Sequence, residues 1–107
     1  MEYITRIEEI LLLSVWKLQK QAYGLAIRKH GSQLLNKNLS VGAVYIPLER
    51  LVKKGHLSVW ESEPTRTRGG RRKRFYQMTS KGLAALNTVK QMNEEAWTGL
   101  PKLVFEN

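Results

Sequence analysis

The stretch Glu63-Pro64-Thr65-Arg66-Thr67-Arg68-Gly69-Gly70-Arg71-Arg72-Lys73-Arg74-Phe75-Tyr76 decides the fold of this chain. Six of the nine residues from 66 to 74 are cationic, and none is acidic. The glycine pair in the middle suits a tight reversal between two strands. The pattern therefore predicts a β-hairpin with a basic tip. The alternative is a disordered basic linker, because blocks of like charge are often disordered.

The residues on both sides of this stretch favour the hairpin over the linker. Residues 57–61 and 74–78 alternate as strands do, and the second would return antiparallel to the first. Thr79 then caps a last helix, which is expected to end near residues 97–98. The hairpin is therefore expected to be held between ordered elements.

A helix is predicted immediately before the hairpin. Ser40 is a good N-cap for residues 41–54, and Gly55 ends them. Pro47 lies inside this helix, where it removes one backbone hydrogen bond and normally costs ~3 kcal/mol. A kink or an irregular first turn is expected there.

Two further helices precede this one. Thr5 and Glu8 form a capping-box pattern, and apolar residues at helical spacing follow as far as Leu18. This first helix is apolar on nearly every side, so its second face is expected to contact another subunit. The second helix opens at residues 22–25, and Gly31 inside it predicts a break nearby.

Composition indicates one small domain with a polyanionic partner. The 107 residues carry a formal charge of +9, and all nine acids are Glu. None of them lies between residues 10 and 48 or between 64 and 93, so the positive field is concentrated in the middle of the chain. The start is not a signal peptide, and the apolar run at 10–16 is too short to cross a bilayer. We expect a soluble cytoplasmic protein.

Enzymatic and metal sites are not predicted. The chain has no cysteine, which excludes disulfides, thiolate ligands and Cys nucleophiles. Adjacent pairs such as Glu8-Glu9 and Glu94-Glu95 diverge on helices, so they cannot face each other as acid and base. His30 and His56 lack ligands at metal spacing, and packing explains them better. We therefore expect no catalytic residue, no metal and no cofactor.

The element order is that of a winged helix-turn-helix. Small residues at the start of the third helix let its N-terminus approach a phosphate, and basic residues further along can lie on the backbone. An ordinary amphipathic helix with solvated lysines has the same pattern. Arginines at the hairpin tip suit phosphates or a narrow minor groove, whereas Arg74 would pair with Glu61 or Glu63 across the hairpin. The candidate DNA-binding residues are Tyr23, Ser40, Gly42, Ala43, Tyr45, Arg50, Lys53, Lys54, Arg66, Arg68, Arg71, Arg72 and Lys73.

Tryptophans on the first and last helices indicate a second site. If these helices form a dimer interface, Trp16 and Trp97 could line an apolar cavity for a flat aromatic effector. Plain packing of the interface is the simpler explanation. The candidate residues for the dimer interface or effector pocket are Leu12, Trp16, Leu86, Val89, Asn93 and Trp97.

Four segments, in order and at family spacing, resemble the PadR-like transcriptional regulators: Ala22-Tyr23-Gly24, Leu39–Tyr45, Leu48–Gly55 and Gly69–Gly82. The resemblance spans about residues 7 to 90. It implies a winged-helix fold, homodimerisation through the first and last helices, and DNA binding, mostly by repressors. Val41 and Ile46 stand where the family commonly has proline, and the effector does not carry over.

The sequence thus predicts a mainly α fold with a small β-hairpin (α+β). Residues 1–80 would form the winged-helix DNA-binding domain, and residues 81–107 a C-terminal dimerisation helix with a short tail. The expected function is that of a dimeric transcriptional regulator on a pseudo-palindromic operator. The alternative is a winged-helix module that binds proteins without reading DNA.

Overall fold

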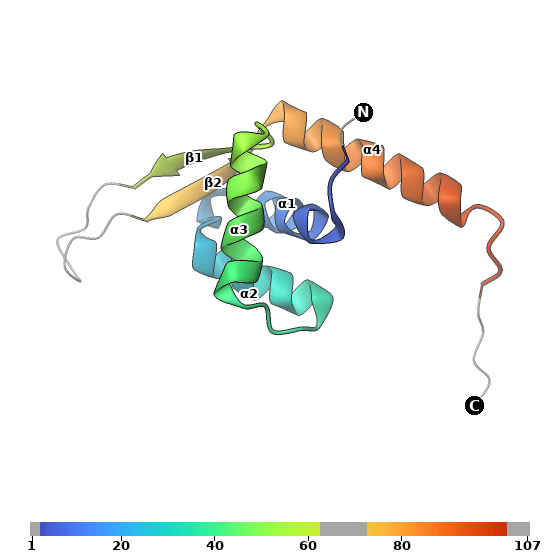
Figure 1. Cartoon of the computed structure of the whole chain (residues 1–107), viewed down its shortest axis with the longest axis horizontal. Coiled ribbons are helices and arrows are strands. Elements are labelled where there is room, and N and C mark those ends of the chain that lie inside the picture. The colour runs from blue at the N-terminus through green and yellow to red at the C-terminus, as the bar shows by residue number, and fades with distance from the viewer. Residues whose placement is uncertain (1–2, 63–72, 103–107) are drawn as a thin grey trace.

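The computed structural model describes residues 3–62 and 73–102. The elements follow in the order α1 (Arg6–Leu18), a 3₁₀ turn η1 (Gln19–Gln21), α2 (Gly24–Leu35), α3 (Val41–Lys53), β1 (Leu57–Glu61), β2 (Arg74–Met78) and α4 (Ser80–Trp97). Three helices form a compact body, the hairpin extends from one side of it, and α4 extends from the other (Figure 1). The predicted class, mostly helical with a two-stranded antiparallel hairpin, is confirmed.

Side-chain caps begin three of the helices where the sequence predicts them. At α1 the Glu8 amide donates to Thr5 Oγ1 at 3.2 Å, and the Thr5 amide donates to Glu8 Oε1 at 2.8 Å. Ser40 caps α3 by accepting from the Ala43 amide, and Thr79 caps α4 by accepting from the Gly82 amide. Each cap supplies a partner for an amide that the helix cannot satisfy itself.

The predicted break in the second helix is wrong, because α2 runs without interruption from Gly24 to Leu35. Gly31 is buried where α2 meets α1. A Cβ there would lie 3.4 Å from Leu39 Cδ1 and 3.7 Å from Ile10 Cγ2. These are ordinary van der Waals distances, so an alanine would fit at this position as well, and the glycine does not end the helix.

The third helix continues through Pro47, so the proline does not end it, and the predicted kink or irregular first turn stays a prediction. Pro47 is buried, so apolar contact of its ring offsets the backbone hydrogen bond that it removes. The helix ends at Lys53, and Gly55 follows with a φ of +81°. Glycine adopts this left-handed conformation without strain, as its predicted role in ending the helix requires.

The hairpin is antiparallel, with Leu57 opposite Met78 and Glu61 opposite Arg74. The pairing continues one step beyond the strands, since the Ser62 amide donates to the Lys73 carbonyl at 2.9 Å. An isolated bridge joins Tyr23 to Phe75, which attaches β2 to the start of α2. The predicted strands are confirmed, and the glycine pair of the tip lies outside the described residues.

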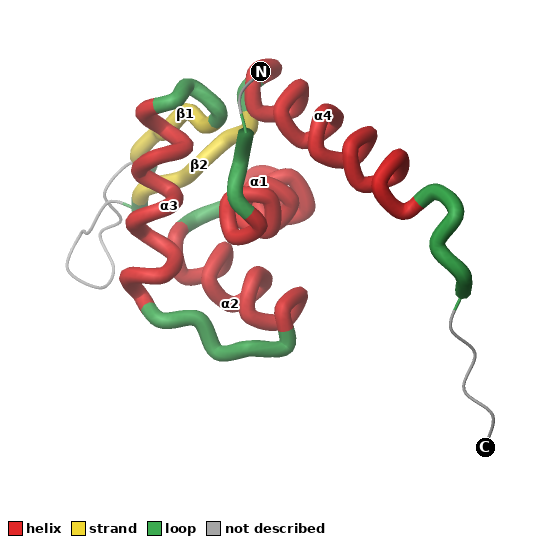
Figure 2. The backbone as a smooth tube through the Cα atoms, turned by 45° about the vertical axis from the view of Figure 1, so that its right-hand side comes forward, coloured by secondary structure: helices red, strands yellow, loops and turns green. Residues whose placement is uncertain are grey.

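One apolar core joins α1, α2, α3 and the hairpin. Its fully buried members include Leu11 and Leu12 from α1, Leu48 and Leu51 from α3, and Tyr76 from β2. The tube drawn in Figure 2 shows α4 leaving this body after its first turns. Within the described part of the chain, every residue of α4 beyond Lys90 is exposed. No helix among the described residues is both long and apolar enough to span a membrane.

Candidate nucleic-acid interface

The third helix turns one face to the core and the other to solvent. Its inner face is fully buried at Val44, Leu48 and Leu51. On the outer face, Ile46 is 63% exposed and Val41 is 55% exposed. The predicted residues Ser40, Gly42 and Tyr45 are exposed as well, while Ala43 is half-buried. The N-terminal half of α3 is therefore available to a groove.

Tyr45 connects this face to the start of α2. Its hydroxyl lies so close to Gly24 that any Cβ at that position would overlap it. Tyr23, the N-cap of α2, makes no side-chain hydrogen bond to the helix, so the first-turn amides lack a side-chain cap. A hollow of about 230 Å³ opens at this point. It is lined by Tyr23, Gly24, Leu25, Tyr45, Lys73, Arg74 and Tyr76.

Aromatic contacts fix the base of the hairpin beside this hollow. Trp60 stacks on Phe75, with ring centroids 4.4 Å apart and planes 10° apart. Phe75 meets Tyr23 edge to face, at 5.7 Å between centroids. Lys73 Nζ lies 4.4 Å from the centroid of the Tyr23 ring. The structure thus brings Tyr23, Tyr45 and Lys73 together, three of the residues that the sequence proposes for DNA.

The predicted partner of Arg74 is corrected by the structure. Arg74 Nη1 lies 2.8 Å from Glu49 Oε1 on α3, an ion pair between the hairpin and the helix. Glu61 stands opposite Arg74 in the strand register, but Glu49 takes the guanidinium, and Glu63 lies outside the described residues. This ion pair neutralises Glu49, which is the one acid of α3. Burial raises the pKa of the neighbouring Tyr76 hydroxyl, although the Arg74 charge opposes the rise.

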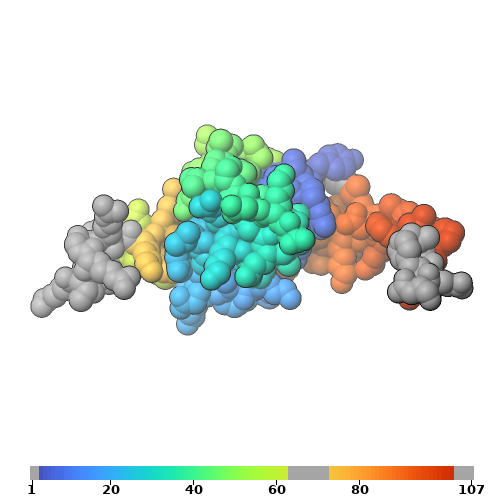
Figure 3. All heavy atoms as spheres, turned by 90° about the horizontal axis from the view of Figure 1, so that it is seen from below, coloured from blue at the N-terminus to red at the C-terminus, as the bar shows by residue number. Residues whose placement is uncertain are grey.

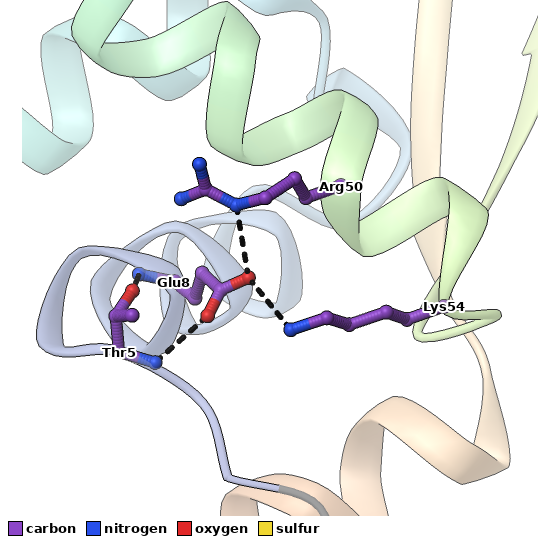
Figure 4. A network of polar contacts seen from close by, with 4 residues as sticks. All are labelled: Thr5, Glu8, Arg50 and Lys54. Carbon is purple, nitrogen blue, oxygen red and sulfur yellow. Dashed lines mark hydrogen bonds and ion pairs between the residues drawn. The ribbon is translucent and has the colours of Figure 1, made fainter.

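Arg50 and Lys54, both predicted to contact DNA, turn toward α1 in the structure. Figure 4 shows their side chains converging on the carboxylate of Glu8 from two successive turns of α3. Arg50 Nε lies 3.6 Å from Glu8 Oε2, and Lys54 Nζ lies 3.4 Å from the same atom. Glu8 itself is 1% exposed. Both cations therefore have a structural role in joining α3 to α1.

The Glu8 carboxylate stays ionised in this position. Burial by itself raises its pKa, but hydrogen bonding with Thr5 and the charge of Lys54 outweigh burial, so the pKa lies below its ordinary value. A buried charge of this kind is tolerated only with several partners. Lys53, the next cation along α3, is exposed and makes no ion pair among those found in the described residues.

Sequence reasoning missed Arg28, which positions the loop before α3. Its Nε donates to the Leu39 carbonyl at 2.7 Å, eleven residues further on. The Leu39 amide donates in turn to Ser32 Oγ at 3.1 Å. No spacing rule predicts contacts between a helix and the loop that follows it, so no sequence signal could have identified this arginine.

The arginines proposed for the tip, Arg66, Arg68, Arg71 and Arg72, lie outside the described residues. Their role in DNA binding stays a prediction. In the space-filling view of Figure 3 the two described strands stand at one end of the molecule and α4 at the other, with α2 and α3 between them. The described strands and α4 therefore lie on opposite sides of the helical body.

The structure separates the residues proposed for the dimer interface or effector pocket. Leu12 is fully buried in the core, so its proposed place on an interface or in a pocket is wrong: the side of α1 that carries it packs against the body of the same chain. Trp16 is 51% exposed and Trp97 is 67% exposed. They line two different hollows, one with Leu86 and Asn93 beside Trp16, the other with Val89 and Asn93 beside Trp97. Asn93 borders both.

Metal ligands do not gather anywhere in the described part of the chain, where no group of three His, Asp or Glu side chains converges. His30 contacts Ser14, with Nδ1 and Oγ 2.8 Å apart, and Ser14 Oγ donates to the Ile10 carbonyl. His56 is fully buried between α3 and β1. Both histidines thus lie in packed positions.

A helix with an exposed N-terminal half, preceded by a second helix and followed by a hairpin, defines the class of winged helix-turn-helix proteins. Residues 12–88 match the "Transcriptional regulator PadR-like family". The chain belongs to this family and is a transcription regulator. Members are transcription regulators and not enzymes, which agrees with the sequence prediction.

Solved structures share the fold. A PadR-like transcription factor from Bacteroides fragilis is 25% identical, with 84% of this chain and 82% of that chain covered and a TM-score of 0.69. A transcriptional regulator from Clostridium thermocellum is 20% identical, with 92% of each chain covered and a TM-score of 0.68. A PadR family regulator from Clostridium difficile R20291 is 22% identical, with 87% and 95% covered and a TM-score of 0.66. No curated protein gave a match.

Proposed function

We propose that the protein is a sequence-specific DNA-binding repressor that acts as a homodimer in the cytoplasm. The N-terminal half of α3 enters the major groove, and the basic hairpin binds phosphates or the minor groove. The observation that carries the proposal is the exposed face of α3 at Val41–Ile46, flanked by Lys73 on the hairpin and by the uncapped start of α2.

The charges around this face support a polyanion as the partner. Glu49 is the one acid on α3, and Arg74 neutralises it at 2.8 Å. Lys53 on α3 and Lys73 before β2 are both exposed. Backbone amides at a helix N-terminus, such as those of α2, also favour a phosphate. Contacts of these kinds fix the position of a protein on DNA, whereas base-edge contacts give sequence preference.

The exposed apolar side chains of α1 and α4 support the dimer. Trp16, Leu83, Met92 and Trp97 are each more than 40% exposed in the single chain. Large exposed apolar side chains on neighbouring helices are typical of a surface that another subunit covers. On this proposal residues 81–107 form the dimerisation segment, and a two-fold axis relates two α3 helices that read a pseudo-palindromic operator.

A small aromatic effector is the further part of this proposal. The hollows beside Trp16 and Trp97 share Glu9 and Asn93, so a second subunit that covers them would enclose a space lined by both tryptophans and by polar side chains. Plain packing of the interface is the alternative. Titration with flat aromatic compounds separates the two, because only a pocket changes the fluorescence of Trp97. If the fluorescence change is absent in the variant Trp97→Phe, the change can be assigned to Trp97.

The salt dependence of DNA affinity tests the proposed interface. For a DNA-binding protein, log Kd against log salt has a slope of about 0.9 for each phosphate that is neutralised. We expect Lys53→Gln and Lys73→Gln each to flatten the slope by about one contact. The matched control is Lys102→Gln, an exposed lysine beyond α4. Equal slopes in all three variants would contradict the proposed interface.

A module that binds only proteins is the alternative function. It would bind the DNA upstream of its own gene no better than random DNA of equal length. A gel-shift competition between these two DNAs therefore distinguishes the two functions, and preference for the upstream DNA supports the repressor.

A further inference from the structure

The side chains that α3 exposes for base contacts are mainly apolar. Val41 is 55% exposed and Ile46 is 63% exposed, and both lie in the N-terminal half of the helix. Gly42 carries no side chain, and a Cβ on it would lie 3.9 Å from Ile46 Cδ1. That turn of the helix is therefore bare beside Ile46, and an incoming group could reach the isoleucine.

The polar side chains of α3 are occupied within the chain or lie elsewhere on it. Arg50 faces Glu8, and Glu49 is paired with Arg74. The Tyr45 hydroxyl lies against Gly24, and Tyr45 lines a different hollow from Ile46. Lys53 is the last residue of the helix, at the end opposite Val41. Few side chains of α3 are thus available to hydrogen-bond base edges. Val41 and Ile46 can make only apolar contacts with the bases.

DNA presents one apolar group in its major groove. Thymine carries a C5-methyl there, whereas cytosine, adenine and guanine carry hydrogen-bonding groups without a methyl. Val41 and Ile46 are five residues apart, which is about 7.5 Å along the helix and about 140° around its axis, so the two side chains point in different directions from the same end of α3. This distance corresponds to roughly two base-pair steps. The two side chains could therefore touch methyl groups on nearby but separate base pairs.

We propose that Val41 and Ile46 determine specificity by contacting thymine methyl groups in each half-site of the operator. This inference rests on the proposed function, in which α3 lies in the major groove. The charges favour DNA over an apolar protein partner for this face. Lys37 lines the same hollow as Ile46, Lys73 lies in the hollow beside Tyr45, and Glu49, the one acid of α3, is paired with Arg74. A protein partner is the other possible occupant, and the test separates the two.

Replacement of thymine by uracil tests the proposal, because uracil pairs in the same way but lacks the methyl. The probe is a duplex selected by the protein from a random DNA library, made once with thymine and once with uracil. Fluorescence anisotropy gives the Kd of each duplex. We expect wild-type affinity to fall about fourfold for every methyl that is contacted, as burial of one methyl-sized group implies. Uracil placed at single positions then locates these methyls.

Protein variants show which residues read the methyls. In the double variant Val41→Ala plus Ile46→Ala we expect weaker binding to the thymine duplex and no further loss with uracil. Val59→Ala, which alters an exposed valine on β1, is the control and should keep the full difference. Circular dichroism verifies that each variant is folded.

The outcomes separate the inference from the function on which it rests. Selected DNA bound equally with thymine and uracil overturns the methyl contacts and leaves DNA binding intact. A uracil effect that persists in the double variant overturns the assignment to Val41 and Ile46. If the library yields no duplex that binds better than random DNA, both the inference and the proposed function fail, and a protein partner becomes the occupant of this face.

Discussion

The substitution Glu8→Gln tests the network that joins α1 to the third helix. Glutamine has nearly the same shape, and its amide oxygen can still accept from the Thr5 amide, so the cap of α1 is kept. What the protein loses is the attraction between one negative charge and two cations, Lys54 at 3.4 Å and Arg50 at 3.6 Å. The change therefore isolates the ionic part of the network.

The expected loss in the free energy of unfolding depends on how far the charged side chains are exposed to solvent. Contacts to a charged group contribute about 1.5–3 kcal/mol when they are well formed. The Lys54 and Arg50 side chains are 39% and 46% exposed, and solvent screens them. We therefore expect a loss of about 1–2 kcal/mol in the free energy of unfolding. In a domain of this size that corresponds to a fall of about 5–10 °C in Tm.

The pH dependence of the loss has a definite sign. The pKa of Glu8 in the folded protein lies below its ordinary value of 4.5, so its charge stabilises the fold above that pH. As pH falls through the folded pKa, the wild type binds a proton and loses the same interactions. The difference between wild type and Glu8→Gln should therefore be largest near neutral pH and should shrink below pH 4.5.

Thermal unfolding followed by circular dichroism, at one protein concentration and a series of pH values, measures this difference. The matched control is Glu9→Gln, which removes an ion pair at 3.0 Å to an Arg6 side chain that is 70% exposed. Such a surface pair contributes less than ~1 kcal/mol. Equal losses for the two variants would show that the buried charge of Glu8 does not stabilise the fold more than a surface ion pair does. A difference that stays constant from pH 7 to the lowest pH at which both variants fold would contradict the predicted pH dependence.

Three further substitutions have defined outcomes. Gly82→Ala places a Cβ onto the His56 carbonyl oxygen, and a backbone atom cannot move away as a flexible side chain can. We therefore expect the free energy of unfolding, measured with urea, to fall by about 1–3 kcal/mol. A change near zero would contradict this packing. Gly24→Ala forces the Tyr45 hydroxyl aside, so DNA affinity should fall while Tm changes little; an unchanged Kd would remove Tyr45 from the interface. Trp97→Ala should raise the dissociation constant of the dimer about tenfold or more in sedimentation equilibrium, and equal constants would place the interface elsewhere.

The ends of most helices and strands could be predicted from short-range sequence patterns. The caps at Thr5, Ser40 and Thr79 act over three residues, so the sequence shows both partners of each. Strand alternation needs only five residues at a time, and it located both strands of the hairpin. The basic hairpin and the exposed start of α3 were thus predictable as candidate DNA contacts.

Contacts between distant residues were not predictable in this way. Lys54 and Glu8 are 46 positions apart, and only packing of α3 on α1 brings them together. Arg74 likewise forms its ion pair with Glu49 on α3, although Glu61 is its cross-strand neighbour, because the hairpin lies against the third helix. The first helix is apolar on nearly every side, so its sequence could not show that Leu12 faces the core while Trp16 stays exposed.

A hydroxyl-radical footprint on the DNA upstream of the protein's own gene tests whether the protein recognises an operator. We expect two protected patches, related by a pseudo-two-fold axis and separated by about 34–36 Å, one helical turn, or a multiple of it. These patches should survive an excess of random DNA. Uniform weak protection that random DNA abolishes, or no protection at all, would contradict the claim that this winged helix reads a specific operator.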